Sequence, residues 1–401
     1  MQQLPLEGVR VVDFTTAQAG AHCTQWLGVM GAEVIKIESR VRPDVTRLSS
    51  RAETLDQSAS FVSFNSGKKS ITLNMNQPKA VQIVKELVKL SDVVTENFGG
   101  ATMERWGLGY PELKRLKPDI IVFATSGYGR TGPRKESPAF APVVDAFSGL
   151  LSVNGYVGGI PNVVGNRGWT DAMAAVHGAF VILAALYHRS NTGEGQYIDA
   201  SMTELNANVL GELVIDYAMN ERVAQPVGNR DNIMAPHGCY RCLGEDKWVA
   251  VAVSSEQEWQ AFCNALGNPE WTKKEEFSDG LSRLNNQEEL NRLIEEWTKQ
   301  HSHYEVMEIL QKVGVMAGAC LTLEELKSDR QLREREFLLD IEQPLIGKLC
   351  LSRMPWRLSG TPGGNYYRAP LLGEHNNYVF GELLGMPEQE IRRLEEEKVI
   401  Y

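Results

Sequence analysis

Asp171 is the residue whose type and position most directly suggest chemistry. It follows Gly168-Trp-Thr170 and opens a long apolar stretch with helical periodicity. One interpretation makes it a helix N-cap, which accepts hydrogen bonds from first-turn N–H groups and complements the helix dipole. The other makes it a carboxylate nucleophile, because a helix terminus also stabilises developing negative charge. The residues alone favour the N-cap, since aspartate at a helix start is common, but one residue can serve both roles.

A glycine-rich motif, Gly127-Tyr-Gly129-Arg-Thr-Gly132, follows a predicted strand and matches GxGxxG. A dinucleotide site also needs a helix that opens on the last glycine, so that its N–H groups meet the pyrophosphate. The residues that follow, PRKESPAFAP, contain further prolines and little apolar periodicity. The motif therefore argues against a Rossmann nucleotide site. No GxxxxGK[ST] or HExxH motif indicates an NTPase or a metalloprotease.

Three arginines in loops after predicted strands are candidates for binding phosphate. Arg105 lies beyond a strand that ends near Glu96, and Arg40 and Arg42 follow a strand over 33–38. A guanidinium group matches the geometry of phosphate oxygens, but an exposed salt bridge is the ordinary alternative. The sequence leaves both interpretations open.

Alternating strands and helices in the first 130 residues must position these side chains. Apolar, β-rich runs alternate with segments of helical spacing; the expected strands are 9–16, 33–38, 70–75, 92–96 and 119–126, and the clearest helices are 17–32 and 78–90. This alternation predicts an α/β fold with a parallel sheet covered by helices on both faces. Ligands of such sheets bind in the loops at the carboxyl ends of the strands.

The pattern changes in the second half of the chain. A helix over 172–188, a strand over 196–201 and a helix over 204–220 precede a polar segment rich in Gly, Pro and Asn. A strand and three amphipathic helices beyond it predict a smaller α+β domain. We expect a large domain over 1–220, a small domain with linkers over 221–330, and a return of 331–401 to the large domain.

Composition and charge exclude several classes of protein. The 401 residues carry 41 Lys and Arg against 51 Asp and Glu, a net charge of −10, and 43% are hydrophobic. This acidic, globular composition argues against nucleic acid or an anionic membrane surface as the main partner. The apolar stretch 172–187 is shorter than a membrane span, and the start of the chain lacks signal-peptide character. Six scattered cysteines fit free thiols in a cytoplasmic protein, and we expect no metal site.

Six segments together resemble the class III CoA-transferases, the family of formyl-CoA transferase and carnitine CoA-transferase. They are ordered along the chain as in that family: LEGVRVVDFTTAQAG at 6–20, GAEVIKIES at 31–39, ENFGGATMERWGLGY at 96–110, SGYGRTGP at 126–133, NTGEGQYIDASM at 191–202 and RAPLLGEH at 368–375. The resemblance implies a large Rossmann-like domain with an inserted smaller domain, in two interlocked chains. It implies a CoA thioester as substrate and no permanently bound cofactor.

The resemblance also implies the chemistry, with Asp171 at the position of the nucleophile. Its carboxylate would attack a donor acyl-CoA, giving a mixed anhydride and CoA thiolate. The thiolate would then form an aspartyl-CoA thioester, from which an acceptor carboxylate takes CoA by the reverse steps. Gln18 matches a position close to the reacting carbonyl and could donate a hydrogen bond to the oxyanion.

Positions that contact CoA in the family are also matched. They correspond to Asn97, Phe98 and Arg105, the last of which would bind the phosphates. Where formyl-CoA transferase has an arginine after IKIE, this chain has Ser39, and Arg40 follows one place later. We therefore expect rearranged contacts at the adenine end, with Arg40 among them.

The glycine-rich flap of formyl-CoA transferase has no counterpart around 226–240. The loop 228–237 is the candidate to cover the site in its place.

Two alternatives stay within the superfamily. The α-methylacyl-CoA racemases move an α-proton with a His and an Asp, but the position of that His holds Phe140 here, which cannot exchange a proton. An inactive subunit of a paired transferase would not need Asp171.

The TTAQAG and ENFGG segments look closer to the formyl-CoA and benzylsuccinate CoA-transferase branches than to the racemases. We therefore expect CoA transfer from succinyl-CoA to an aryl- or alkyl-succinate such as benzylsuccinate, by a homodimer or by a heterodimer with a related subunit.

Overall fold

The computed structural model describes residues 4–48, 52–162 and 168–401 of the chain. They divide into two compact units: the larger comprises Met1–Leu151, Val163–Val223 and Arg333–Tyr401, and the smaller comprises Ser152–Asn162 and Ala224–Leu332. The segment 152–162 thus differs from the expectation of one domain over 1–220. A backbone hydrogen bond of 3.0 Å from Gly228 N–H to the Gly155 carbonyl holds it in the smaller unit.

Six parallel strands form the sheet of the larger unit, which confirms the predicted α/β class. The strands are β1 (Arg10–Asp13), β2 (Glu33–Glu38), β3 (Lys69–Thr72), β4 (Val93–Glu96), β5 (Ile121–Ser126) and β6 (Tyr197–Ser201). Their order is β3-β2-β1-β4-β5-β6, with every neighbouring pair parallel. The order reverses between β1 and β4, and the carboxyl ends of strands at such a switch point are where ligands bind.

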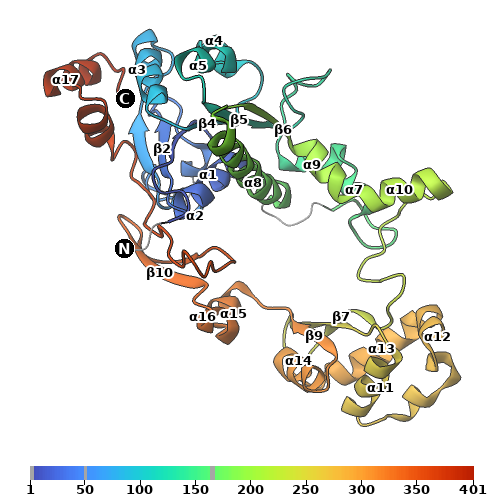
Figure 1. The fold of residues 1–401 in the computed structure, drawn as a ribbon. Helices are drawn as coiled ribbons and strands as arrows, with labels where there is room; N and C mark the ends of the chain where they lie inside the picture. The colour runs from blue at the N-terminus through green and yellow to red at the C-terminus, as the bar shows by residue number, and fades with distance from the viewer. Residues whose placement is uncertain (1–3, 49–51, 163–167) are drawn as a thin grey trace. The chain divides into compact units, whose positions relative to one another are not determined.

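Helices cover both faces of this sheet (Figure 1). Because successive strand residues point to opposite faces, Val12 of β1 packs toward α3 (Pro78–Lys89) and α5 (Tyr110–Leu116). Val11 packs toward α1 (Ala19–Val29) and α8 (Trp169–Thr192). Both valines are fully buried, and each such side chain contributes about 1.5–3 kcal/mol relative to exposure.

Helix α8 runs past the sheet between two left-handed glycines, Gly168 (φ 72°) and Gly193 (φ 76°). It is longer than the expected 172–188. Among the described residues it is the one helix long and apolar enough to cross a membrane, judged by length and composition. A helix packed in a protein core meets the same criteria, and here Ala175, Ala179 and Ile182 are buried against the sheet.

The helix expected over 204–220 is two helices, α9 (Met202–Val209) and α10 (Gly211–Asn220). Leu210 lies between them with non-helical backbone angles, although the apolar periodicity continues through it. Ser201 caps α9, accepting a hydrogen bond from Glu204 N–H. The remaining short helices before residue 160 are η1 (Val45–Arg47), α2 (Ala59–Asn65), α4 (Thr102–Arg105), α6 (Ala141–Phe147) and α7 (Leu150–Val153).

The smaller unit packs helices on an antiparallel sheet. Its strands are β7 (His237–Arg241), β8 (Trp248–Ala252) and β9 (Met316–Ala319), in that order. Its core joins Val249 and Val251 to Phe262, Leu290 and Leu310 of the helices. The helical segments are α11 (Glu256–Ala265), η2 (Glu270–Lys273), η3 (Glu275–Phe277), α12 (Gly280–Asn285), α13 (Gln287–Thr298), α14 (His303–Lys312) and α15 (Leu323–Ser328).

The C-terminal segment packs on the first sheet. Asn376 binds Thr72 at the end of β3 through two hydrogen bonds, Thr72 N–H to Oδ1 (2.9 Å) and Nδ2 to Thr72 Oγ1 (3.0 Å). Phe380 and Leu394 join the core beside α3. The elements of this segment are α16 (Arg330–Glu334), β10 (Leu338–Gln343), β11 (Gly347–Ser352), the π-helix η4 (Asn377–Leu383) and α17 (Glu388–Glu396).

Candidate active site

Asp171 and Gln18 both lie beside Gly168. Asp171 lies in the first turn of α8, and Gln18 is the N-cap residue of α1, just beyond the loop that follows β1. A Cβ placed on Gly168 would stand 2.9 Å from Asp171 Oδ2 and 3.0 Å from Gln18 Oε1. The two side chains, 153 residues apart in sequence (171 − 18), therefore converge on one point that only a glycine leaves open. This arrangement brings together the expected nucleophile and the expected oxyanion donor.

Asp171 is not the N-cap of its helix. That position belongs to Gly168, and no side-chain capping bond is formed there. The carboxylate is mostly buried, and burial, followed by the charge of nearby Asp145, raises the pKa of Asp171 to about 6. A carboxylate with few solvating groups is a stronger nucleophile than one in water, and a pKa of about 6 leaves it largely ionised at pH 7.

Three buried polar side chains form a hydrogen-bonded group that includes Thr170, the residue before Asp171. Thr170 Oγ1 donates to Asp145 Oδ1, and Asn206 Nδ2 donates to Thr170 Oγ1 (2.7 Å) and to Asp145 Oδ1 (3.1 Å). These residues join α6, α8 and α9, and all three are essentially inaccessible. Among the described atoms, Asp145 Oδ2 has no hydrogen-bond partner. Sequence reasoning missed this group, because no motif connects its three members.

The glycine-rich motif ties strand ends together. As predicted, no helix opens on Gly132; the next helix is α6. Arg130, inside the motif, forms an ion pair with Glu96 at the end of β4, and its N–H donates to Asp199 Oδ1 of β6 (2.9 Å). Burial raises the pKa of Glu96 to about 7, against the lowering effect of Arg130.

A cavity of about 320 Å³ opens at the carboxyl ends of β1 and β2. Thr15 and Thr16 form part of its wall, so the loop that leads to Gln18 also borders the cavity. Aromatic side chains and charged groups share its lining, among them Phe14, Lys36, Arg42, Asp44, Phe98 and Trp106.

Of the three residues expected to contact CoA, Phe98 is among those that line the cavity, whereas Asn97 and Arg105 are not. Phe98 lines the cavity, with the Arg42 guanidinium 5.8 Å from its ring centre. Arg105 donates to Thr102 Oγ1 (2.9 Å) from α4. The Asn97 amide is bound on both sides by the backbone of Thr16.

Arg40 is exposed, and its N–H donates to the Tyr401 carbonyl. It is not among the described residues that line the cavity, whereas Arg42 is. Of the two arginines that follow β2, it is therefore Arg42 and not the expected Arg40 that lines the cavity. Residue spacing alone does not distinguish between them.

Comparisons with known proteins agree on one family. The sequence model described as CoA-transferase family III matches residues 6–376. Succinyl-CoA–L-malate CoA-transferase beta subunit of Chloroflexus aurantiacus is 33% identical over 99% of this chain and 98% of its own. Succinyl-CoA–D-citramalate CoA-transferase of the same organism is 31% identical over 99% and 98%. A CAIB/BAIF family protein from Brucella suis, 28% identical, superposes with a TM-score of 0.87 over 95% of this chain and all of its own.

Proposed function

The chain belongs to CoA-transferase family III, and we propose that it transfers CoA from succinyl-CoA to a substituted succinate through Asp171. The convergence of Asp171 and Gln18 beside Gly168 carries this proposal. It places a partly desolvated carboxylate and an amide around one small space, as an acyl-transfer site requires.

The mechanism follows from these two side chains. Asp171 attacks the thioester carbonyl, the C–S bond breaks, and a mixed anhydride and CoA thiolate result. The thiolate attacks the aspartyl carbonyl and releases succinate, which leaves an aspartyl-CoA thioester. The acceptor carboxylate attacks this thioester and the steps run in reverse to give the new acyl-CoA. The Gln18 amide N–H donates to the oxyanion formed in each addition.

The acceptor class is supported by the names of the relatives. Malate and citramalate, which appear in two of those names, are succinates substituted at the second carbon. Benzylsuccinate carries a benzyl group at the corresponding carbon, so it belongs to the same chemical class. The pocket that accepts such an acid needs room for the substituent and a cation or hydrogen-bond donors for the second carboxylate.

We propose that the cavity beside β1 and β2 takes the nucleotide end of CoA. Phe98 and Trp106 offer aromatic surface for an adenine ring, and Arg42 offers a cation at the rim. Arg105, the last residue of α4, is the proposed phosphate contact. The loop that contains Thr15 and Thr16 borders this cavity and leads to Gln18, so one loop connects the proposed nucleotide site with the proposed oxyanion donor.

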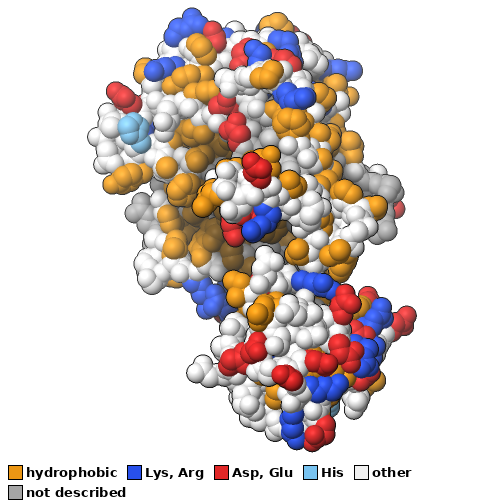
Figure 2. Space-filling view, turned by 90° about the vertical axis from the view of Figure 1, so that its right-hand side faces the viewer, with side chains coloured by type: hydrophobic (Ala, Val, Ile, Leu, Met, Phe, Trp, Pro, Cys, Tyr) orange, Lys and Arg blue, Asp and Glu red, His pale blue; other side chains and the backbone are white. Residues whose placement is uncertain are grey.

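We also propose that the chain acts as a dimer. Helix α10 has no buried residue, and Val214, Ile215 and Met219 are each at least 60% exposed. Figure 2 shows that hydrophobic side chains gather around a hollow on one face of the larger unit, whereas charged residues of both signs dominate the smaller unit. So much exposed apolar surface is unusual on a monomer. Light scattering should give twice the chain mass; a monomer would contradict self-association and point to a related partner subunit.

A direct assay tests the transfer. Purified protein is incubated with succinyl-CoA and, separately, malate, citramalate, benzylsuccinate or oxalate, and new CoA thioesters are identified by liquid chromatography with mass spectrometry. We expect a new thioester with at least one substituted succinate and none with Asp171→Asn. Transfer to oxalate alone would overturn the acceptor class.

A further inference from the structure

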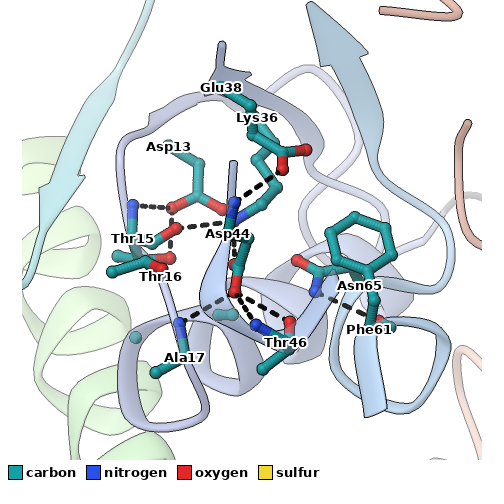
Figure 3. Close-up of polar contacts among 12 residues, drawn as sticks. Asp13, Thr15, Thr16, Ala17, Lys36, Glu38, Asp44, Thr46, Phe61 and Asn65 are labelled. Atoms are coloured by element: carbon teal, nitrogen blue, oxygen red, sulfur yellow. Dashed lines mark hydrogen bonds and ion pairs between the residues drawn. The ribbon is translucent and has the colours of Figure 1, made fainter. Parts of the chain in front are cut away.

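The loop Thr15–Ala17, which joins β1 to Gln18, is held by side chains from other elements (Figure 3). Thr15 N–H donates to Asp13 Oδ1 at 2.9 Å. The Thr15 carbonyl accepts from Lys36 Nζ at 2.5 Å. The first bond is a local turn to the residue two places earlier, whereas the second comes from β2. A loop carbonyl that is bound by a buried side chain of another strand is more constrained than one that faces water.

The next two residues are held in the same way. Thr16 N–H donates to Asn97 Oδ1 and the Thr16 carbonyl accepts from Asn97 Nδ2, both at 2.8 Å. Ala17 N–H donates to Asp44 Oδ1 at 3.1 Å. Five successive backbone groups, from Thr15 N–H to Ala17 N–H, are therefore bound by side chains of β1, β2, the turn after β2 and the end of β4.

Two of these side chains form a buried ion pair. Lys36 Nζ lies 2.9 Å from Asp44 Oδ2, and the two side chains are 0% and 1% exposed. Burial alone would lower the pKa of Lys36, but Asp44, Asp13 and Glu38 hold it above its ordinary value. Both partners therefore stay charged, and the charge-assisted hydrogen bond from Lys36 to the carbonyl of the buried Thr15 is stronger than a neutral one.

The loop conformation needs this support. Ala17 has φ 60°, in the left-handed region that residues other than glycine rarely adopt. A residue kept in that region is stable only where its surroundings impose it. The strained residue immediately precedes Gln18, whose side chain must face Asp171.

We infer that Lys36, Asp44 and Asn97 are positioning residues that act on the reaction through Gln18. This inference rests on the proposed transferase function. The three side chains fix the loop so that the Gln18 side chain already lies beside Gly168 and Asp171 before substrate arrives, within reach for its amide N–H to donate to the oxyanion once that forms. Lys36 and Asp44 also line the 320 Å³ cavity, so one buried pair supports both the cavity wall and the loop that carries Gln18.

Asn97→Ala is the most informative variant, because it removes two hydrogen bonds without leaving a buried charge unpaired. Asn376→Ala is its matched control: Asn376 binds the N–H and hydroxyl of Thr72 at the end of β3, away from the loop. We expect Asn97→Ala to lower kcat at least tenfold while KM for succinyl-CoA changes less than threefold. Each variant loses two hydrogen bonds, so Asn376→Ala should lower Tm by about as much as Asn97→Ala does. Its kcat should stay near the wild-type value. A rise in KM alone would instead mark Asn97 as a CoA contact and overturn the inference.

A double-mutant cycle separates positioning from a general loss of structure. Gln18→Ala should lower kcat by about 10²–10³, as loss of an oxyanion donor does. Adding Asn97→Ala should then lower kcat no further, because its effect is exerted through Gln18. Additive losses, or a Gln18→Ala enzyme with wild-type kcat, would overturn the inference while leaving the transferase function intact.

Hydrogen exchange provides a readout that does not depend on activity. The amides of Thr16 and Ala17 should exchange slowly in the wild type and at least tenfold faster in Asn97→Ala, in a peptide covering 14–20. Unchanged exchange in Asn97→Ala would overturn the inference that Asn97 fixes the loop, even if no transfer is detected. Faster exchange in a protein without transferase activity would reject only the proposed function.

Discussion

Asp171 Oδ2 and Gln18 Oε1 lie 2.9 and 3.0 Å from the single point at which residue 168 would carry a Cβ. The arrangement of these two side chains thus requires that residue 168 has no side chain of its own. Gly168 also has φ 72°, so glycine is required there both by backbone conformation and by space.

Gly168→Ala should abolish most activity, because its methyl group would push Asp171 and Gln18 apart. Gly193→Ala is the matched control: Gly193 ends the same helix with φ 76°, and a Cβ there meets nothing within 4 Å. Each variant should lose about 1–2 kcal/mol of stability from the left-handed backbone. Only Gly168→Ala should lose kcat, by 100-fold or more; equal kcat values in the two variants would contradict the role of this space.

The pH dependence of transfer should report the pKa of Asp171. Since the nucleophile is the carboxylate, kcat/KM should rise as pH increases through about 6. Asp145→Asn removes the neighbouring negative charge but not the burial, which is the larger cause of the shift. In this variant the rise of kcat/KM with pH should therefore move to lower pH while staying above the ordinary range of a carboxyl group. An unchanged pH dependence would show that Asp145 does not act on Asp171.

Asp171→Asn should stabilise the folded protein at neutral pH. The pKa of Asp171 is raised from 3.8 to about 6, so ionisation at pH 7–8 opposes folding, and this penalty is absent below the unfolded pKa of 3.8. One pKa unit corresponds to about 1.4 kcal/mol, so the gain from removing the charge is up to about 3 kcal/mol. Urea unfolding at pH 8 and at pH 5 measures it; the gain should shrink at the lower pH, and a constant gain would argue against a raised pKa.

Arg105→Ala should weaken binding of the acyl-CoA. We expect a rise of about tenfold in KM with little change in kcat, because a phosphate contact remote from the thioester contributes to ground and transition states alike. Arg115→Ala, which removes an exposed cation paired with Glu112, is the control and should leave both constants unchanged. Equal KM values for the two variants would contradict the phosphate contact.

Much of the fold could be predicted from the sequence, because parallel strands and amphipathic helices leave periodic patterns. The strand Glu33–Glu38 has the bounds that its apolar run predicts. The break at Leu210 was missed because apolar residues continue on both sides of it, although Gly211, which begins the second helix, is the local signal for it. Asp171 looked like an N-cap because the true cap, Gly168, is recognisable only from its left-handed backbone.

The site could be predicted only in part. Asp171 and Gln18 were found by resemblance, whereas their supporting residues lie far away in sequence. Lys36 interrupts an apolar strand without indicating its partner, and its hydrogen bond to Thr15 spans 21 residues. Asn97 and Thr16 are 81 residues apart. Such contacts depend on strand order and on the register between neighbouring strands, which local patterns do not encode.

The measurement that tests the central claim most directly is trapping of the activated aspartate. Protein turning over succinyl-CoA is quenched with hydroxylamine, digested and examined by peptide mass spectrometry, with Asp171→Asn treated in parallel. We predict a hydroxamate on Asp171 in the wild-type protein and none in the variant. Continued transfer with no adduct on Asp171, or with the adduct on another carboxylate, would contradict its role as the nucleophile.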